Sequence, residues 1–214
     1  MARPVQADAQ ATRTRILEAA SALFASHGLS ETTTRQIARN SQVSLATVHH
    51  YFGGKADLYE ACITRTYDEL ASLADQIEDA LRNLRPGTSA EDILAMAVRR
   101  SYAFARHHRA SVRLLMRTIL DKGESDPLLR ERYQLPMLER GVAMASSVSA
   151  LSPAEVRIRF LALHHVIVHF ALNTPREIAL VTGNPDASPD QAIELVEEFL
   201  VTLAKSQFGI GVSS

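Results

Sequence analysis

The sequence predicts an all-α protein of about nine helices. Apolar residues recur at helical spacing along most of the chain, whereas the alternating pattern of a strand is almost absent. Of the 214 residues, 46% are hydrophobic and 22% are charged, which is typical of a folded protein and not of a disordered one. The single cysteine, Cys62, excludes an internal disulfide framework and a cysteine-based zinc cluster.

The first helix is expected over residues 12–27. Ile16, Ala20 and Phe24 form an apolar stripe there, and Gly28 follows at the place where a helix needs a left-handed terminator.

Two short helices are expected next. Thr33 precedes Gln36 by the three residues of a capping box, and Ser44 can cap a helix over residues 45–51. Two short helices joined by a tight turn predict a helix-turn-helix, whose second helix enters the major groove of DNA.

Longer helices are expected in the rest of the chain. One amphipathic helix begins near residue 56 and ends before the turn Arg85-Pro86-Gly87. Proline in a helix interior collides with the preceding turn, so Pro136 predicts a bend. The other helices are expected over residues 90–107, 112–120 and 127–148 and after the caps Ser152 and Ser188.

The net charge of −1 is unevenly distributed. Residues 1–55 hold six Lys and Arg against three Asp and Glu, whereas the remainder is acidic. A local basic surface is compatible with nucleic acid as a partner. Residues 1–11 lack an apolar signal core, and no run of about 18 apolar residues occurs, so we expect a cytoplasmic protein that binds no membrane.

A longer motif reads Thr33-Thr34-Arg35-Gln36-Ile37-Ala38, then Val43-Ser44, Tyr51-Phe52, Lys55 and Leu58. With this spacing, residues 12–60 resemble the DNA-binding signature of the TetR family of one-component transcriptional regulators. The resemblance implies a homodimer with two DNA-binding heads, a helical body that receives a ligand, and negative regulation. It also implies a DNA-binding domain over residues 1–55 and an effector-binding and dimerisation domain over residues 56–214.

Three features depart from the family pattern. The turn, usually Ala-Gly, is Ser41-Gln42, so the resemblance implies that Gln42 lies where a positive φ is often needed, at a cost of about 1 kcal/mol in strain. Ala46 replaces a glycine that is usual in the recognition helix. His49 stands where the first aromatic residue of the usual run is expected. These differences concern individual contacts with DNA and not the fold.

Several residues are candidates for contact with DNA. Arg can bond bidentately to guanine, hydroxyl and imidazole groups fit base edges and phosphates, and a lysine at a helix amino end attracts phosphate. The resemblance implies that Arg35 and Thr47 contact bases and that His49, Tyr51 and Lys55 contact phosphates. The full set is Thr34, Arg35, Ser44, Leu45, Ala46, Thr47, His49, His50, Tyr51 and Lys55.

The helix around residues 160–172 predicts a dimer. It has no formal charge and is apolar nearly all round, so it must be covered on both sides. With the final helix it would form a four-helix bundle between two copies, which then bind a palindromic operator. The expected interface residues are Leu161, Val168, Leu172, Val196, Leu200 and Leu203.

A small, largely apolar ligand is expected in the helical body, where it would shift the long helix and change the separation of the two heads. The candidate pocket residues are Tyr67, Tyr102, Met116, Met137 and His164. We expect no cofactor.

Two other functions remain open at this point. One is a DNA-binding protein without an effector, and the other is a helical metal-dependent enzyme that uses His164, His165 and His169. Against the enzyme, His165 and His169 have no carboxylate within one turn and no HExxH pattern, and the chain has no nucleophile elbow or phosphate loop. We therefore expect neither an enzyme nor a metal site.

Overall fold

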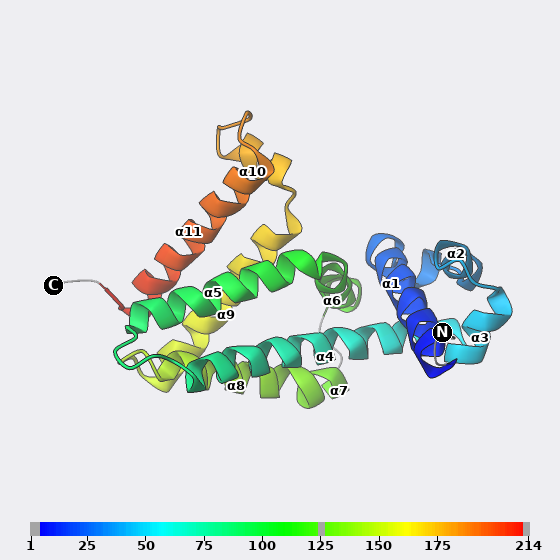
Figure 1. The fold of residues 1–214 in the computed structure, drawn as a ribbon, viewed down its shortest axis with the longest axis horizontal. Helices are drawn as coiled ribbons and strands as arrows, with labels where there is room; N and C mark the ends of the chain where they lie inside the picture. The colour runs from blue at the N-terminus through cyan, green and yellow to red at the C-terminus, as the bar shows by residue number, and fades with distance from the viewer. Residues whose placement is uncertain (1–4, 124–126, 212–214) are drawn as a thin grey trace. The chain divides into compact units, whose positions relative to one another are not determined.

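The computed structural model describes residues 5–123 and 127–211 and is helical almost throughout (Figure 1). Within these ranges it has ten helices of seven residues or more and no strand, which confirms the all-α class. They are α1 Val5–Glu31, α2 Thr34–Asn40, α3 Leu45–Phe52, α4 Lys55–Arg82, α5 Ala90–His107, α6 Arg109–Lys122, α8 Leu135–Ser146, α9 Pro153–Leu172, α10 Pro175–Val181 and α11 Pro189–Phe208. The short α7 Pro127–Leu129 and the π-helical segment η1 Arg130–Gln134 lie before α8.

The chain divides into two compact units. The first comprises residues 1–69 and 110–126, and the second comprises residues 70–109 and 127–214. The first unit therefore extends beyond the predicted segment 1–55, because it includes the amino-terminal half of α4 and nearly all of α6. Sequence periodicity alone does not reveal that α6 packs with helices some fifty residues or more before it.

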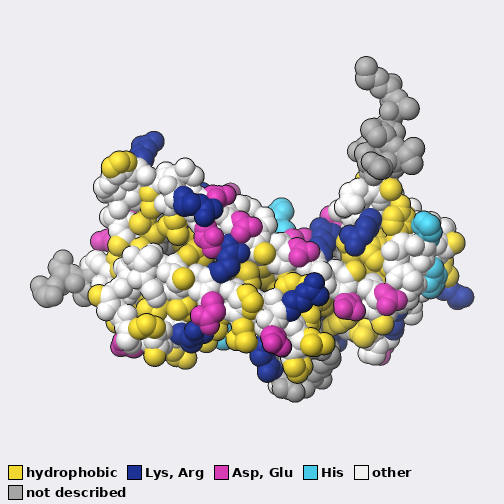
Figure 2. Space-filling model, turned by 90° about the horizontal axis from the view of Figure 1, so that it is seen from below, with side chains coloured by type: hydrophobic (Ala, Val, Ile, Leu, Met, Phe, Trp, Pro, Cys, Tyr) yellow, Lys and Arg dark blue, Asp and Glu magenta, His cyan; other side chains and the backbone are white. Residues whose placement is uncertain are grey.

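Helices α1 to α3 form the amino-terminal part of the first unit. Ile16, Phe24 and Leu58 are fully buried there, and α6 contributes the fully buried Leu114. The hydroxyls of Tyr59 and Thr118 lie 2.9 Å apart and join α4 to α6. Histidine side chains lie on the outer surface of this unit (Figure 2).

Helix α1 changes direction at Gly28, as the sequence predicts. The φ of Gly28 is 78° and its ψ is 176°, which lies outside the helical region, and the chain resumes one short turn to Glu31. A Cβ at this position would lie 2.9 Å from Nε of Arg117 on α6. Arg117 also donates from Nη1 to the carbonyl of Ser26 at 3.2 Å. Glycine is therefore needed at position 28 for its backbone conformation and for close packing.

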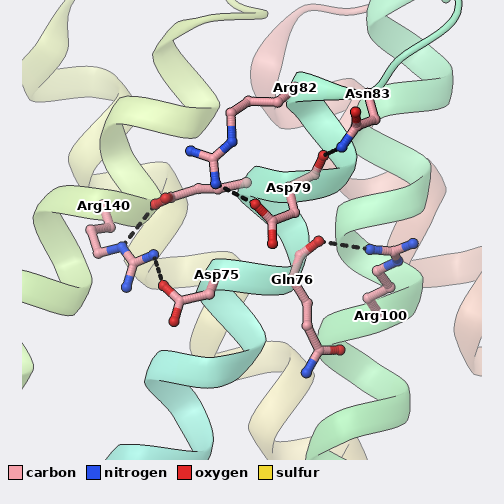
Figure 3. A network of polar contacts seen from close by, with 8 residues as sticks. Asp75, Gln76, Asp79, Arg82, Asn83, Arg100 and Arg140 are labelled. Atoms are coloured by element: carbon pink, nitrogen blue, oxygen red, sulfur yellow. Dashed lines mark hydrogen bonds and ion pairs between the residues drawn. The ribbon is translucent and has the colours of Figure 1, made fainter.

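In the second unit, the carboxyl-terminal half of α4 is bonded to two neighbouring helices (Figure 3). Arg140 of α8 donates to Asp75 at 2.6 Å and to Glu78 at 2.8 Å. Arg100 of α5 donates to the carbonyl of Gln76 at 3.0 Å. The hydrogen bond from Arg140 is the main cause of a lowered pKa at Glu78.

The core of the second unit lies among α5, α8, α9 and α11. Arg99 of α5 donates to Glu197 at 2.8 Å and to Glu198 at 2.6 Å, both on α11. Gly141 of α8 lies against the ring of Phe160 on α9 so closely that a Cβ would collide with it. Buried side chains of α11, including Val196 and Leu200, complete this core.

The helix predicted over residues 127–148 is divided into α7, η1 and α8. Pro136 cannot donate a hydrogen bond and would collide with the turn before it. The π-helical segment immediately precedes Pro136, and the amide of Leu135 donates to the carbonyl of Arg130, five residues back. The predicted disturbance is confirmed, and it takes the form of a wider helical turn.

The helix-start signals read from the sequence are confirmed, and one was missed. Thr33 and Ser152 form capping boxes with Gln36 and Glu155. The short helix α10 was not predicted, although Thr174 just before it and Glu177 in its first turn form a capping box. The signal is the sequence Thr-Pro-Arg-Glu at residues 174–177, but only one helical turn of apolar residues follows it. None of the described helices is long and apolar enough to span a membrane.

Candidate nucleic-acid interface

Helices α2 and α3 form a helix-turn-helix in the first unit. Ile37 and Ala38 of α2 and Val48 and Phe52 of α3 are buried, so each short helix turns one face inward. The opposite faces are left for a partner. Tyr51, a predicted phosphate contact, is half-buried, and its ring packs edge-on against His50 with 5.4 Å between the ring centroids.

The turn between the two helices adopts the conformation that the sequence predicts. Gln42 has a φ of 57° and is the only described non-glycine residue with a positive φ. The amide of Val43 then donates to the carbonyl of Ala38 at 3.0 Å, and the buried hydroxyl of Ser41 donates to the carbonyl of Ile37 at 2.7 Å. These bonds fix the angle at which α3 leaves the turn.

The exposed face of α3 carries the residues predicted to contact DNA. Ser44, Ala46, His49 and His50 are exposed, whereas Leu45 and Thr47 are half-buried. Ser44 accepts from the amide of Thr47 at 3.0 Å and so caps the helix. Within α3, only the imidazoles of His49 and His50 can carry a positive charge, and no carboxylate side chain is present.

The charges around α2 and α3 suit an anionic partner. Residues 34–52 contain Arg35 and Arg39 and no acidic residue. Arg35 is exposed near the start of α2, and Thr34 beside it is half-buried. A surface with cations and without carboxylates can approach phosphates without repulsion.

Lys55 has an intramolecular role that the sequence did not predict. Its Nζ donates to the carbonyl of Leu29 at 2.7 Å and to that of Ser30 at 3.3 Å. The amide of Gly54, at the start of α4, is bonded to the carboxylate of Asp57 at 2.9 Å. This lysine therefore joins the end of α1 to the start of α4, in addition to any contact with DNA.

Two residues of the predicted dimer interface are buried within their own chain. Val196 is 3% exposed and Leu200 is fully buried in the core of the second unit, so neither can be covered by a second copy. The apolar stripe on α11 was correctly read, but it packs within its own chain. The exposed apolar residues of this helix are Leu195 and Phe199, on the side where the glutamates lie.

The interface residues predicted on α9 lie with Ile158 along one accessible side of that helix. Leu161, Val168 and Leu172 are half-buried, and Ile158 on the same stripe is 64% exposed. On α11, Leu203 is also half-buried. The rings of Phe170 on α9 and Phe199 on α11 pack edge to face with 5.7 Å between centroids, so the two helices present a shared apolar surface.

The candidate pocket residues fall into both units. Tyr67 and Met116 belong to the first, whereas Tyr102, Met137 and His164 belong to the second. Tyr102 of α5 is fully buried and its hydroxyl has no hydrogen-bond partner among the described residues. Burial raises the pKa of this phenol.

The side chain of His164 on α9 has an exposed surface. Desolvation, with a smaller contribution from His165, lowers the pKa of its imidazole to about 4. His165 and His169 are exposed. No group of three or more His, Cys, Asp and Glu is placed to hold a metal ion in the described part of the chain.

An all-α chain with an exposed, acid-free helix-turn-helix has the arrangement that is found in helix-turn-helix DNA-binding proteins. Residues 16–62 match the model of the bacterial regulatory proteins of the tetR family. This match covers the helix-turn-helix with parts of α1 and α4, and it shows similarity to that family over this segment.

Three known proteins show the extent of the similarity. The chain is 28% identical over 128 residues to the "Probable HTH-type transcriptional regulator YttP" of Bacillus subtilis (strain 168), a match that spans 57% of this chain and 60% of that protein. A TetR-like regulator from Rhodococcus sp. RHA1 shares the fold with a TM-score of 0.62 at 22% identity, over 95% of this chain and 96% of that one. FadR from Bacillus subtilis in complex with stearoyl-CoA gives a TM-score of 0.58 at 16% identity, over 91% and 98%.

Proposed function

We propose that the protein is a transcriptional repressor that binds a palindromic DNA operator as a homodimer and is released by a small, largely apolar ligand. The observation that carries the DNA-binding part is the exposed surface of α2 and α3, which has arginine, hydroxyl and imidazole groups and no carboxylate. This surface is the size of one short helix. A single short helix contacts few base pairs and gives little sequence specificity, so two copies are needed to bind a defined operator.

Selection of duplexes from a random DNA library tests this proposal. We expect recovery of an inverted repeat whose half-sites are about 34–36 Å apart or a multiple of it. Arg35→Ala is expected to relax the preference at one base position by about 1–3 kcal/mol. If Arg35 contacted a phosphate instead, its loss would weaken the binding of all sequences alike. Recovery of no enriched sequence would contradict the proposed function.

The shared apolar surface of α9 and α11 supports the dimer. Leu195, Phe199 and Ile158 are each about half exposed or more, and large apolar side chains at such positions favour burial against a second copy. We expect Val168→Glu and Phe199→Glu to produce monomers in sedimentation velocity. Leu128→Glu is the matched control, because Leu128 is 77% exposed on α7 and lies outside this surface.

The second unit supports the ligand part of the proposal. The unpaired, buried hydroxyl of Tyr102 needs an acceptor or a donor, and a bound ligand can supply one. FadR, which shares this fold, binds stearoyl-CoA, so a long acyl chain attached to a polar group is the first ligand class to test.

Acyl-CoA thioesters of graded chain length give that test. We expect a long-chain ligand to raise the melting temperature of the protein and to release the selected duplex, and Tyr102→Phe to bind the ligand more weakly without loss of DNA binding. Release without a stabilising shift, or equal ligand binding by Tyr102→Phe, would contradict the assignment of this residue. DNA binding that no ligand alters would favour the effector-independent alternative.

A further inference from the structure

His49 lies in the last turn of α3 with one ring nitrogen already bonded. Its Nδ1 is 2.6 Å from the carbonyl oxygen of Gly53, and the amide of Gly53 donates back to the carbonyl of His49 at 2.8 Å. A carbonyl oxygen only accepts hydrogen bonds, so the proton of the neutral ring is on Nδ1. In that form Nε2 carries a lone pair and can only accept.

The other ring nitrogen of His49 is Nε2. The side chain is exposed, and within the described residues Nε2 has no hydrogen-bond partner. Nε2 becomes a donor only when the ring takes up a second proton and is an imidazolium. The ring is therefore held in one orientation, and its protonation state decides what it can bind.

The charged groups around the turn that follows α3 are compatible with an imidazolium at His49. On α4, the carboxylate of Asp57 lies next to Gly53 and Gly54, and Lys55 is directed to the carbonyls at the end of α1. On α2 the charged residues are Arg35 and Arg39, and on α1 Arg13 lies over the ring of Phe52, 5.2 Å from its centroid. His50 is the neighbouring imidazole on α3 itself.

The position of His49 on α3 selects the kind of DNA group that it meets. In a helix-turn-helix the amino-terminal residues of the second helix reach base edges, whereas flanking residues contact the sugar-phosphate backbone. A phosphate oxygen accepts hydrogen bonds and donates none. Contact with it therefore needs a proton on Nε2, and a neutral His49 would turn its lone pair toward the anion.

We infer that His49 binds a DNA phosphate as an imidazolium, so that each recognition helix takes up one proton when it binds. This inference rests on the proposed function, because it takes α3 as the helix that faces DNA. Histidine ordinarily changes charge between pH 5 and 8. Binding favours the protonated ring, so affinity is greatest at low pH and falls as the pH rises through this range.

The size of the effect follows from the proton count. Once the free imidazole is mostly neutral, the affinity of one head falls about tenfold for each pH unit, and that of a dimer on two half-sites falls up to about a hundredfold. A tyrosine at the same position would give no such dependence, because its hydroxyl donates over this whole range.

The test uses the full chain and the duplex recovered by selection at pH 6.0. Affinity is measured by fluorescence anisotropy from pH 6.0 to 8.5 at constant ionic strength, and proton uptake is measured by calorimetry in two buffers of different ionisation enthalpy. We expect uptake of about two protons per dimer near pH 7.5. His49→Arg is permanently charged and is expected to bind with little dependence on pH, and His49→Gln is expected to bind about tenfold more weakly at pH 6.0 and with a flat profile.

The matched control is His50→Gln, which keeps His49 and is expected to keep the dependence on pH. The inference is overturned if His49→Arg and His49→Gln retain the pH profile of the natural chain, or if affinity rises with pH, as it would for a neutral Nε2 that accepts from a base. Tight binding without proton uptake overturns this inference alone. Absence of DNA binding at every pH overturns the proposed function as well.

Discussion

Substitution of Gly28 by alanine should destabilise the first unit. The backbone at Gly28, with φ 78° and ψ 176°, lies in a region that residues with a Cβ adopt only at a cost of about 1–3 kcal/mol. The new Cβ would also lie 2.9 Å from Nε and 3.0 Å from Nη2 of Arg117. The guanidinium can retreat only by giving up its bond to the carbonyl of Ser26.

Alanine also restricts the unfolded chain, which stabilises the protein by about 0.4–1 kcal/mol and offsets part of the loss. We therefore expect the free energy of unfolding to fall by about 2 kcal/mol, or the melting temperature by about 4–8 °C for a chain of this size. Urea titration followed by far-ultraviolet circular dichroism measures the change.

Two variants separate the backbone strain from the contact. Gly87 has a φ of 86° and no atom within 4 Å of its Cβ position, so Gly87→Ala reports strain at a positive φ alone. Arg117→Ala combined with Gly28→Ala should restore part of the loss, because the collision is removed. Equal losses at positions 28 and 87, or no loss at position 28, would refute the reasoning.

Three further results are expected. Cys62 is fully buried and its burial raises the pKa of the thiol to about 11, so it should resist alkylation at pH 8 until urea unfolds the chain. Arg140→Met should lower stability by about 1 kcal/mol at pH 7. The pKa of Glu78 is lowered in the folded state, so its stabilising contribution is complete at neutral pH and lost on acidification, and the deficit of Arg140→Met should shrink toward pH 3 in urea titrations. Gln42→Val places a β-branched residue at a φ of 57° and should cost about 1–2 kcal/mol in the same assay, whereas an unchanged midpoint would contradict the strain assigned to this turn.

Local signals in the sequence predicted much of the fold. Each confirmed helix start depends on a few adjacent residues, such as Ser44 with Thr47 or Ser152 with Glu155, because a cap is a contact between near neighbours. The two short helices were predictable for the same reason, whereas the positive φ of Gln42 was expected from the family resemblance of the turn.

Contacts between distant residues were not predictable in this way. The apolar stripe that contains Val196 and Leu200 was visible, but periodicity does not say whether a stripe is covered by its own chain or by another. The position of Lys55 against Leu29 and Ser30 depends on packing across 25 residues or more, and no pattern marks it.

The hydrogen bonds from Lys55 to the carbonyls of Leu29 and Ser30 close a loop of the chain that contains α2, the turn and α3. Bringing together the ends of a loop of 26 residues costs about 3 kcal/mol of chain entropy, which the buried residues Ile37, Val48 and Phe52 must offset together with Lys55. Loss of DNA binding on removal of this lysine would thus combine a missing phosphate contact with a loosened loop. Hydrogen exchange at the amides of residues 34–52 in the DNA-free protein would separate the two, since only the loosened loop raises the exchange rate.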